Sequence, residues 1–163
     1  MGLNSSRPKY STGNKYIMSA RDQIISTAYE WLETPYHHHA MVKHVGVDCA
    51  KLVAACALGA GLVTEQIVNA MPNYPVQWHL HNREERLIEL LEAYGCVEKE
   101  LIDTLPGDIV TFQFGRTTSH LGIMVNDSQF IHARYDIGKV VLNDFNDDWN
   151  ARWTRTYAFP GVD

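Results

Sequence analysis

The sequence has few cysteines, no excess of basic residues and no long apolar run. Three cysteines in 163 residues, odd in number and widely spaced, argue against a disulfide framework and favour a reducing compartment. A formal net charge of -5 argues against a nucleic-acid partner, because phosphate binding needs surplus lysine and arginine. No apolar stretch approaches the ~20 residues of a membrane span, and residues 1–18 lack the apolar centre of a signal peptide. We therefore expect cytoplasmic synthesis without a signal peptide or a membrane span.

The composition that is present is typical of one globular domain. Hydrophobic residues make up 45% of the chain and charged residues 20%, and the length is sufficient for one hydrophobic core. Residues 1–17 are polar and contain Pro8 and Gly13. We expect them to form a disordered arm or an expression remnant, followed by a single domain over residues 18–163.

The first part of the chain has helical spacing. Ser19 and Asp22 predict a capping box at the start of a helix over about residues 19–33. This helix should end before Pro35, because the residue that precedes a proline disfavours the helical conformation. Two further helices are expected after residues that favour the N-cap position, Asp48 and Asn82. Between these helices, residues 64–82 predict a long surface excursion.

From residue 96 onward the pattern changes to the alternation of strands. Turn residues separate five predicted strands, at about 109–114, 120–125, 129–133, 139–143 and 153–159. Helices followed by an antiparallel meander predict an α+β fold with a sheet of about five to six strands.

Cys49 occupies the first turn of the helix that follows Asp48. The partial positive charge of a helix N-terminus favours the thiolate, so this position predicts a lowered pKa and a nucleophilic role. Packing in the core is the alternative for any single cysteine, and Cys56, two turns later, fits that role better. A nucleophilic thiol also needs an imidazole within reach and a group that orients the imidazole.

Two of the eight histidines, His120 and His132, fall in predicted neighbouring strands. Gly122 shares the face of His120 and leaves space there. A two-residue hairpin loop would put the two imidazoles on opposite faces. An odd loop or a bulge would place His120 opposite Arg134 and diagonal to His132, roughly 7–8 Å apart. Either histidine alone is typical of an ordinary strand residue, but the set that includes Cys49 favours a site.

Five successive blocks resemble those of the NlpC family of cell-wall cysteine peptidases, and the resemblance covers about residues 19–158. In chain order they are Thr34-Pro35-Tyr36, Val47-Asp48-Cys49-Ala50-Lys51-Leu52-Val53, Leu105-Pro106-Gly107-Asp108-Ile109-Val110, Ser119-His120-Leu121-Gly122-Ile123 and Phe130-Ile131-His132-Ala133. The segment Tyr36-His37-His38 and the region of Trp78-His79 are most similar to the phage-encoded branch found with tail genes.

The resemblance implies a papain-like fold in which the cysteine helix packs on the antiparallel sheet. It implies that Cys49 is the nucleophile, His120 the general base and acid, and His132 the group that orients His120. The residues we assign to substrate binding are Tyr36, His38, Asp48 and Ser119. The activity implied is a cysteine endopeptidase that hydrolyses the stem peptides of peptidoglycan.

The same resemblance implies association with a phage or prophage tail, tail-tip proteins as partners and action in the host cell wall. Two alternatives remain: a catalytically idle structural or adaptor module, and a thiol amidase or acyltransferase on the same scaffold. Ala50 stands where the family usually has serine. The run His37-His38-His39 suggests zinc, but consecutive loop residues cannot all converge on one ion, so we expect neither metal nor cofactor.

Overall fold

The computed structural model describes residues 17–73 and 84–163. Residues 1–16 of the expected arm, the predicted cap at Asn82 and the region of Trp78 lie outside the described residues. Within those residues, no helix combines the length and the apolar character needed to cross a membrane.

The first helix, α1 (Ala20–Glu30), begins with the predicted capping box. The Ser19 side chain accepts from the Asp22 N–H, and the Asp22 carboxylate accepts from the Ser19 N–H at 3.1 Å. The helix ends at Glu30, three residues before the predicted end. Glu33 has a positive φ of 68° and donates its N–H to Val140 O in the sheet at 3.1 Å, so the chain has already left the helical path.

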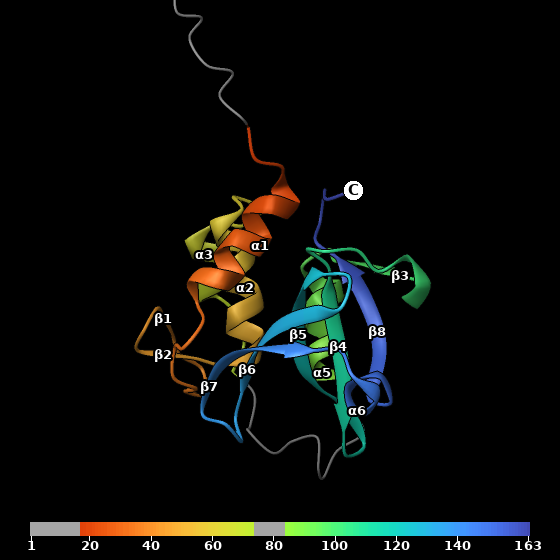
Figure 1. Cartoon of the computed structure of the whole chain (residues 1–163). Coiled ribbons are helices and arrows are strands. Elements are labelled where there is room, and N and C mark those ends of the chain that lie inside the picture. The colour runs from red at the N-terminus through yellow and green to blue at the C-terminus, as the bar shows by residue number, and fades with distance from the viewer. Residues whose placement is uncertain (1–16, 74–83) are drawn as a thin grey trace, which may run out of the picture.

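The second helix, α2 (Cys49–Gly59), begins after Asp48 as predicted, because the Asp48 side chain accepts from the Lys51 N–H at 2.8 Å. It is buried on almost every side and lies beside α1 (Figure 1). The remaining helices are short: α3 (Glu65–Asn69), α5 (Arg86–Ala93) and α6 (Asp147–Asn150), with a 3-10 turn at Leu101–Asp103. Neither α3 nor α6 was predicted.

Six strands form one antiparallel sheet in the order β3-β8-β4-β5-β6-β7. They are β3 (Val97–Lys99), β4 (Ile109–Phe114), β5 (Thr117–Asn126), β6 (Gln129–Arg134), β7 (Lys139–Asp144) and β8 (Trp153–Ala158). A separate hairpin pairs β1 (Met41–Val42) with β2 (Gly46–Val47). The predicted α+β class is therefore confirmed. Strand β5 begins three residues earlier than predicted, since Thr117 and Thr118 already pair with β4.

The two faces of the sheet bury different side chains. Leu121, Ile123 and Ile131 belong to the main core, together with residues of α1, α2 and α5. Alternate residues of the same strands, Met124 and Phe130, belong to a second cluster with three other aromatic or apolar residues, Val110, Phe112 and Trp149. The predicted assignment of Leu121 and Ile123 to the core face is confirmed.

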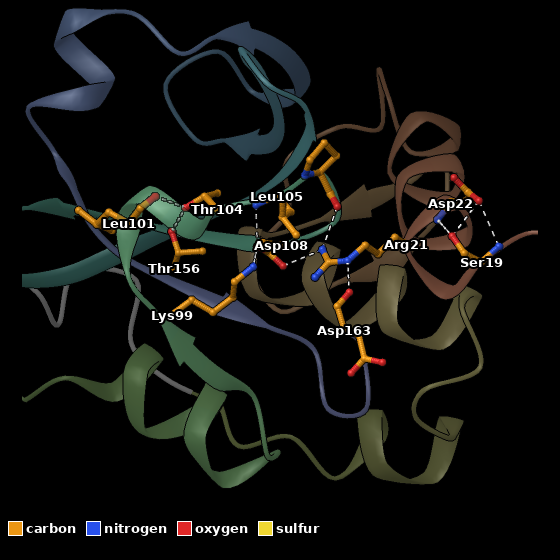
Figure 2. Close-up of polar contacts among 11 residues, drawn as sticks. Ser19, Arg21, Asp22, Lys99, Leu101, Thr104, Leu105, Asp108, Thr156 and Asp163 are labelled. Carbon is orange, nitrogen blue, oxygen red and sulfur yellow. Dashed lines mark hydrogen bonds and ion pairs between the residues drawn. The ribbon is translucent and has the colours of Figure 1, made fainter.

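A buried charged cluster, which we call the Asp108 cluster, ties α1 to the sheet (Figure 2). The Asp108 carboxylate is 0% exposed and accepts from Arg21 Nη1 at 2.8 Å, Lys99 Nζ at 2.6 Å and the Leu105 N–H at 2.8 Å. Arg21 also donates to the carbonyls of Pro106 and Asp163, at 2.9 and 2.5 Å, which brings the C-terminus beside the start of α1. Every polar atom of this carboxylate therefore has a charged or amide partner.

Candidate active site

A cleft beside the N-terminus of α2 collects most of the predicted site residues. Its walls come from α2, β4, β5, β6, β7, α6 and the segment before β1. The lining residues are Tyr36, Cys49, Phe114, Ser119, His120, Ala133, Arg134, Tyr135, Asp136, Asn143, Asn146, Asp148, Trp149 and Arg152. The structure thus brings together residues that lie up to 116 positions apart, from Tyr36 to Arg152.

Cys49 is the first residue of α2 and is 7% exposed. Its sulfur interacts with the backbone N–H of Leu121, the residue after His120 on β5, and this contact lowers the pKa of the thiol. Burial acts in the opposite direction and is stronger, and the negative charge of Asp48 adds to it, so the pKa rises to about 12. The predicted lowering of the Cys49 pKa by the helix N-terminus is therefore wrong for the free protein.

The β5–β6 hairpin places both histidines on one face. Ile123 pairs with Ile131 and Met124 with Phe130, but the next pair is Asn126 with Gln129, so β5 has one extra residue, a bulge at Val125. The predicted odd loop or bulge is confirmed. When this register is continued along the strands, His120 lies opposite Arg134 and Gly122 opposite His132.

Gly122 is required by this arrangement because neighbouring side chains fill the space above it. A Cβ atom at Gly122 would lie 2.8 Å from Cδ2 of Phe130 and 3.5 Å from Cβ of His132. The space that the sequence predicted beside His120 is thus used by the ring of Phe130 and by His132.

The imidazoles of His120 and His132 are in direct contact. His120 Nε2 lies 2.7 Å from His132 Nδ1, and His132 Nε2 lies 2.7 Å from Oδ1 of Asn143 on β7. Phe130 pairs with Asn143 and His132 with Val141, so Asn143 is one diagonal step from His132 across β6 and β7. Three strands therefore contribute one polar side chain each to a continuous hydrogen-bonded row.

Both imidazoles are neutral in this setting. Burial lowers the pKa of His120 well below its usual value, and the nearby His132 and Arg134 lower it further. Burial lowers the pKa of His132 to about 4, although its hydrogen bond to Asn143 acts in the other direction. Together with the raised pKa of Cys49, these shifts give a resting site with a neutral thiol and a neutral imidazole.

Trp149 covers the histidine row from α6. Its ring meets His132 edge-on at 4.8 Å and 83°, and lies 6.0 Å from the ring of His120. Asn146 fixes the start of α6, because its side chain accepts from the Trp149 N–H. This aromatic cover contributes to the burial that lowers the pKa values of both histidines.

Tyr36 and two arginines complete the cleft. Tyr36 donates its N–H to Gly138 O at 2.7 Å and pairs with Val47, so its backbone is held between β2 and the turn before β7. Arg134 forms an ion pair with Asp136. The guanidinium of Arg152 lies 4.4 Å above the ring of Phe114, and no carboxylate in residues 17–73 and 84–163 forms an ion pair with it.

The other predicted substrate-binding residues have different surroundings. Ser119 lines the cleft, but its hydroxyl donates to Phe114 O at 3.2 Å and accepts from the Phe114 N–H at 3.3 Å. Asp48 is 1% exposed, and its oxygens accept from the N–H groups of Lys51 and His39 at 2.8 Å. Neither Asp48 nor His38 is among the described residues that line the cleft. Their roles in substrate binding stay predictions.

His38, His39 and Asp48 are the one group of described residues whose donor atoms gather closely enough to suggest a metal. Each offers a ligand atom within 4.8 Å of the others. Nδ1 of His38 and Nδ1 of His39 lie 3.6 and 4.0 Å from Oδ2 of Asp48. Tetrahedral zinc, with bonds of ~2.0–2.1 Å, implies ligand separations of roughly 3.3 Å. These side chains would have to approach one another more closely to hold a zinc ion. The expectation that the protein binds no metal stays a prediction.

The sequence patterns did not identify several residues of the site. Asn143, Arg134, Tyr135 and Arg152 were not proposed as site residues. One signal was available for Asn143, because it is a polar residue within the otherwise apolar strand Val140-Val141-Leu142. Its partner could not be identified without the register between β6 and β7.

An α+β domain with a cysteine at the head of a buried helix, beside a histidine pair on an antiparallel sheet, has the architecture of papain-like thiol peptidases. The chain belongs to the NlpC/P60 family, whose model matches residues 27–158. This is a family of papain-like cell-wall peptidases, most of them cysteine peptidoglycan hydrolases and some of them non-catalytic. No curated protein matches the sequence.

Solved structures with low sequence identity share the fold. NlpC1 from Trichomonas vaginalis is 20% identical with a TM-score of 0.57, over 86% of this chain and 43% of its own. The peptidoglycan hydrolase RipB from Mycobacterium tuberculosis is 17% identical with a TM-score of 0.53, over 85% of this chain and 63% of its own. RipD from the same organism is described as non-catalytic and adapted to peptidoglycan binding. It is 12% identical with a TM-score of 0.57, over 87% of this chain and 98% of its own. The chain thus spans less than half of NlpC1.

Proposed function

We propose that this protein is a cysteine endopeptidase that hydrolyses stem peptides of peptidoglycan, with Cys49, His120 and His132 as its catalytic residues. The observation that carries the proposal is the contact of 2.7 Å between His120 and His132 in a row that opens into the same cleft as Cys49. Membership of the NlpC/P60 family supports the substrate class.

The neutral resting state suggests how the chemistry would begin. The substrate carbonyl would approach Cys49, and His120 would remove the thiol proton as sulfur bonds to the carbonyl carbon. The backbone N–H of Cys49, at the start of α2, and the hydroxyl of Tyr36 are candidate donors to the oxyanion. The imidazolium of His120 would then protonate the leaving amine as the C–N bond breaks. Water, deprotonated by His120, would hydrolyse the thioester and restore the thiol.

The charges of the cleft support an anionic peptide as the substrate. Arg152 presents a guanidinium that no described carboxylate pairs, and Arg134 presents a second one bound to Asp136. Asp148 also lines the cleft and would repel carboxylates near α6. Stem peptides carry free carboxylates, which a planar guanidinium binds through two hydrogen bonds.

Digestion of purified peptidoglycan tests the proposal. The intact protein should release peptide fragments with new amino and carboxyl ends, whereas Cys49→Ala should release none. Cys56→Ala, a change at another buried thiol, is the matched control and should retain activity. Release of the whole stem from the glycan would instead identify an amidase, and equal behaviour of intact protein and Cys49→Ala would contradict hydrolysis by Cys49.

The similarity to RipD supports a second candidate, a peptidoglycan-binding module without catalysis. In that case the protein should sediment with peptidoglycan and release no fragment, and Cys49→Ala should bind equally well. The endopeptidase requires release that depends on Cys49, so the two functions give opposite results in one assay.

We also propose that the protein acts from a phage or prophage tail, on the resemblance of Tyr36-His37-His38 to the phage-encoded branch. Virions purified from an induced host should contain the protein as a tail component when analysed by mass spectrometry. Its presence in the host lysate but not in purified virions would contradict this proposal.

A further inference from the structure

The row of hydrogen bonds ends at Asn143, a residue with no part in the reaction proposed above. Asn143 is half-buried on β7, and its Oδ1 is 2.7 Å from Nε2 of His132, a residue that is 0% exposed. The other ring nitrogen of His132, Nδ1, is 2.7 Å from Nε2 of His120. Asn143 thus contacts one imidazole directly and the second one through it.

The acceptor at the end of the row determines where the protons lie. An amide oxygen can only accept, so His132 must donate from Nε2. A neutral imidazole has one donor and one acceptor nitrogen, so Nδ1 of His132 accepts and Nε2 of His120 donates. The remaining nitrogen of His120, Nδ1, then carries a lone pair.

We infer that Asn143 is a positioning residue that fixes the tautomers of both histidines and so leaves Nδ1 of His120 as the base. The chemical meaning of this inference rests on the proposed function, although the tautomers themselves do not. With the amide of Asn143 reversed, Nδ2 would donate to His132. Both imidazoles would then invert and His120 would hold a proton where a base needs a lone pair.

The neutral amide also explains how this row differs from one that ends in a carboxylate. A carboxylate at position 143 would accept the same hydrogen bond but would favour imidazolium over imidazole. Asn143 orients the row without adding charge beside two buried rings that burial and Arg134 already keep neutral. The amide therefore supports a base that is free of its proton before substrate arrives.

Nitrogen-15 NMR of histidine-labelled full-length protein tests the inference without any substrate. Single His→Gln variants assign the signals. At pH 7 both His120 and His132 should show a protonated Nε2 and an unprotonated Nδ1. A protonated Nδ1 on His120 would overturn the inference, and this measurement needs no change at Asn143.

Two variants separate positioning from simple packing. Asn143→Leu removes the acceptor, so His132 should lose its fixed tautomer and peptidoglycan hydrolysis should fall about tenfold, the equivalent of one hydrogen bond. Asn143→Asp should keep the tautomers and move the acid limb of the activity profile to higher pH. Asn126→Asp, a change at a β5 amide that bonds to Gln129, is the control. It should change neither the histidine tautomers nor the rate and pH profile of hydrolysis.

The outcomes also separate this inference from the proposed function. The expected tautomers in a protein that cannot cleave peptidoglycan would support the row and contradict the peptidase. Cleavage by a protein whose tautomers and pH profile do not respond to either Asn143 variant would support the peptidase and overturn the positioning role.

Discussion

The protein contains two buried groups of polar side chains, and one of them is charged whereas the other is neutral. The Asp108 cluster is charged, and two cations and an amide N–H surround its carboxylate (Figure 2). The row His120-His132-Asn143 is neutral and is enclosed by aromatic rings. The charges of the Asp108 cluster join α1, β3 and the turn before β4, whereas the neutrality of the histidine row preserves a proton acceptor. Burial alone therefore does not determine ionisation, because the available partners decide it.

The largest expected effect concerns the thiol beside the neutral row. Since burial raises the pKa of Cys49 to about 12, its alkylation by iodoacetamide at pH 7 should be roughly a thousandfold slower than in the unfolded chain. Peptide-level mass spectrometry over pH 7–10 should show the rate rising about tenfold per pH unit. Fast labelling at pH 7 would instead indicate a preformed thiolate and would remove the contrast with the charged cluster.

Breaking the charged cluster should cost the most stability. Asp108→Ala leaves Arg21 and Lys99 without their shared carboxylate, and the free energy of unfolding should fall by about 3–5 kcal/mol. Urea denaturation measures the change. Asp103→Ala, at an exposed position of the nearby 3-10 turn, is the matched control and should change it by less than ~0.5 kcal/mol. Equal effects of the two substitutions would show that the buried charges do not hold the elements together.

The neutral row should make the fold sensitive to acid. The pKa of His132 is about 4 when folded, below the ordinary value of 6.5, so the unfolded chain takes up its proton first as the pH falls. The stability from His132 is present above pH 6.5 and lost toward pH 4, on the order of 3 kcal/mol. Urea denaturation between pH 7.5 and 4 should be less pH-dependent in His132→Gln than in the intact protein. The exposed His44→Gln should leave the slope unchanged, and parallel curves for all three proteins would contradict a neutral His132.

The smallest expected effect is at an exposed ion pair, which provides a scale for the buried one. Lys139 Nζ lies 2.5 Å from Glu33 Oε2, and both side chains are well exposed. Glu33→Gln should change the free energy of unfolding by no more than ~1 kcal/mol, and salt should reduce the difference further. A loss as large as that of Asp108→Ala would mean that burial adds nothing to the Asp108 cluster.

The alternation of strand residues was sufficient to predict much of the fold and the shared face of the two histidines. Because side chains alternate along a strand, an odd loop or a bulge puts His120, Gly122 and His132 on the same face of the sheet. Both the alternation and the loop are local features of the sequence. The capping box at Ser19 and the N-cap at Asp48 are equally local, so both helix starts were predicted correctly.

The remainder depends on contacts that no local pattern contains. Asn143 joins the site through the register of β6 with β7, and Trp149 through the short helix α6. The Cys49 pKa was predicted with the wrong sign because helix position is visible in the sequence, whereas the depth of burial is a property of the packed molecule. The first helix ends early because Glu33 bonds to Val140, more than a hundred positions away.

The single extra residue at Val125 has a consequence for how this hairpin can vary in length. Deleting one residue there would turn every later side chain of β6 by half a strand period, so that His132 would point toward α2 and Ile131 toward the cleft. Such a protein would keep its sheet and lose its imidazole pair. Removing two residues would restore the original phase. Length changes in this hairpin are therefore compatible with the cleft only in even steps.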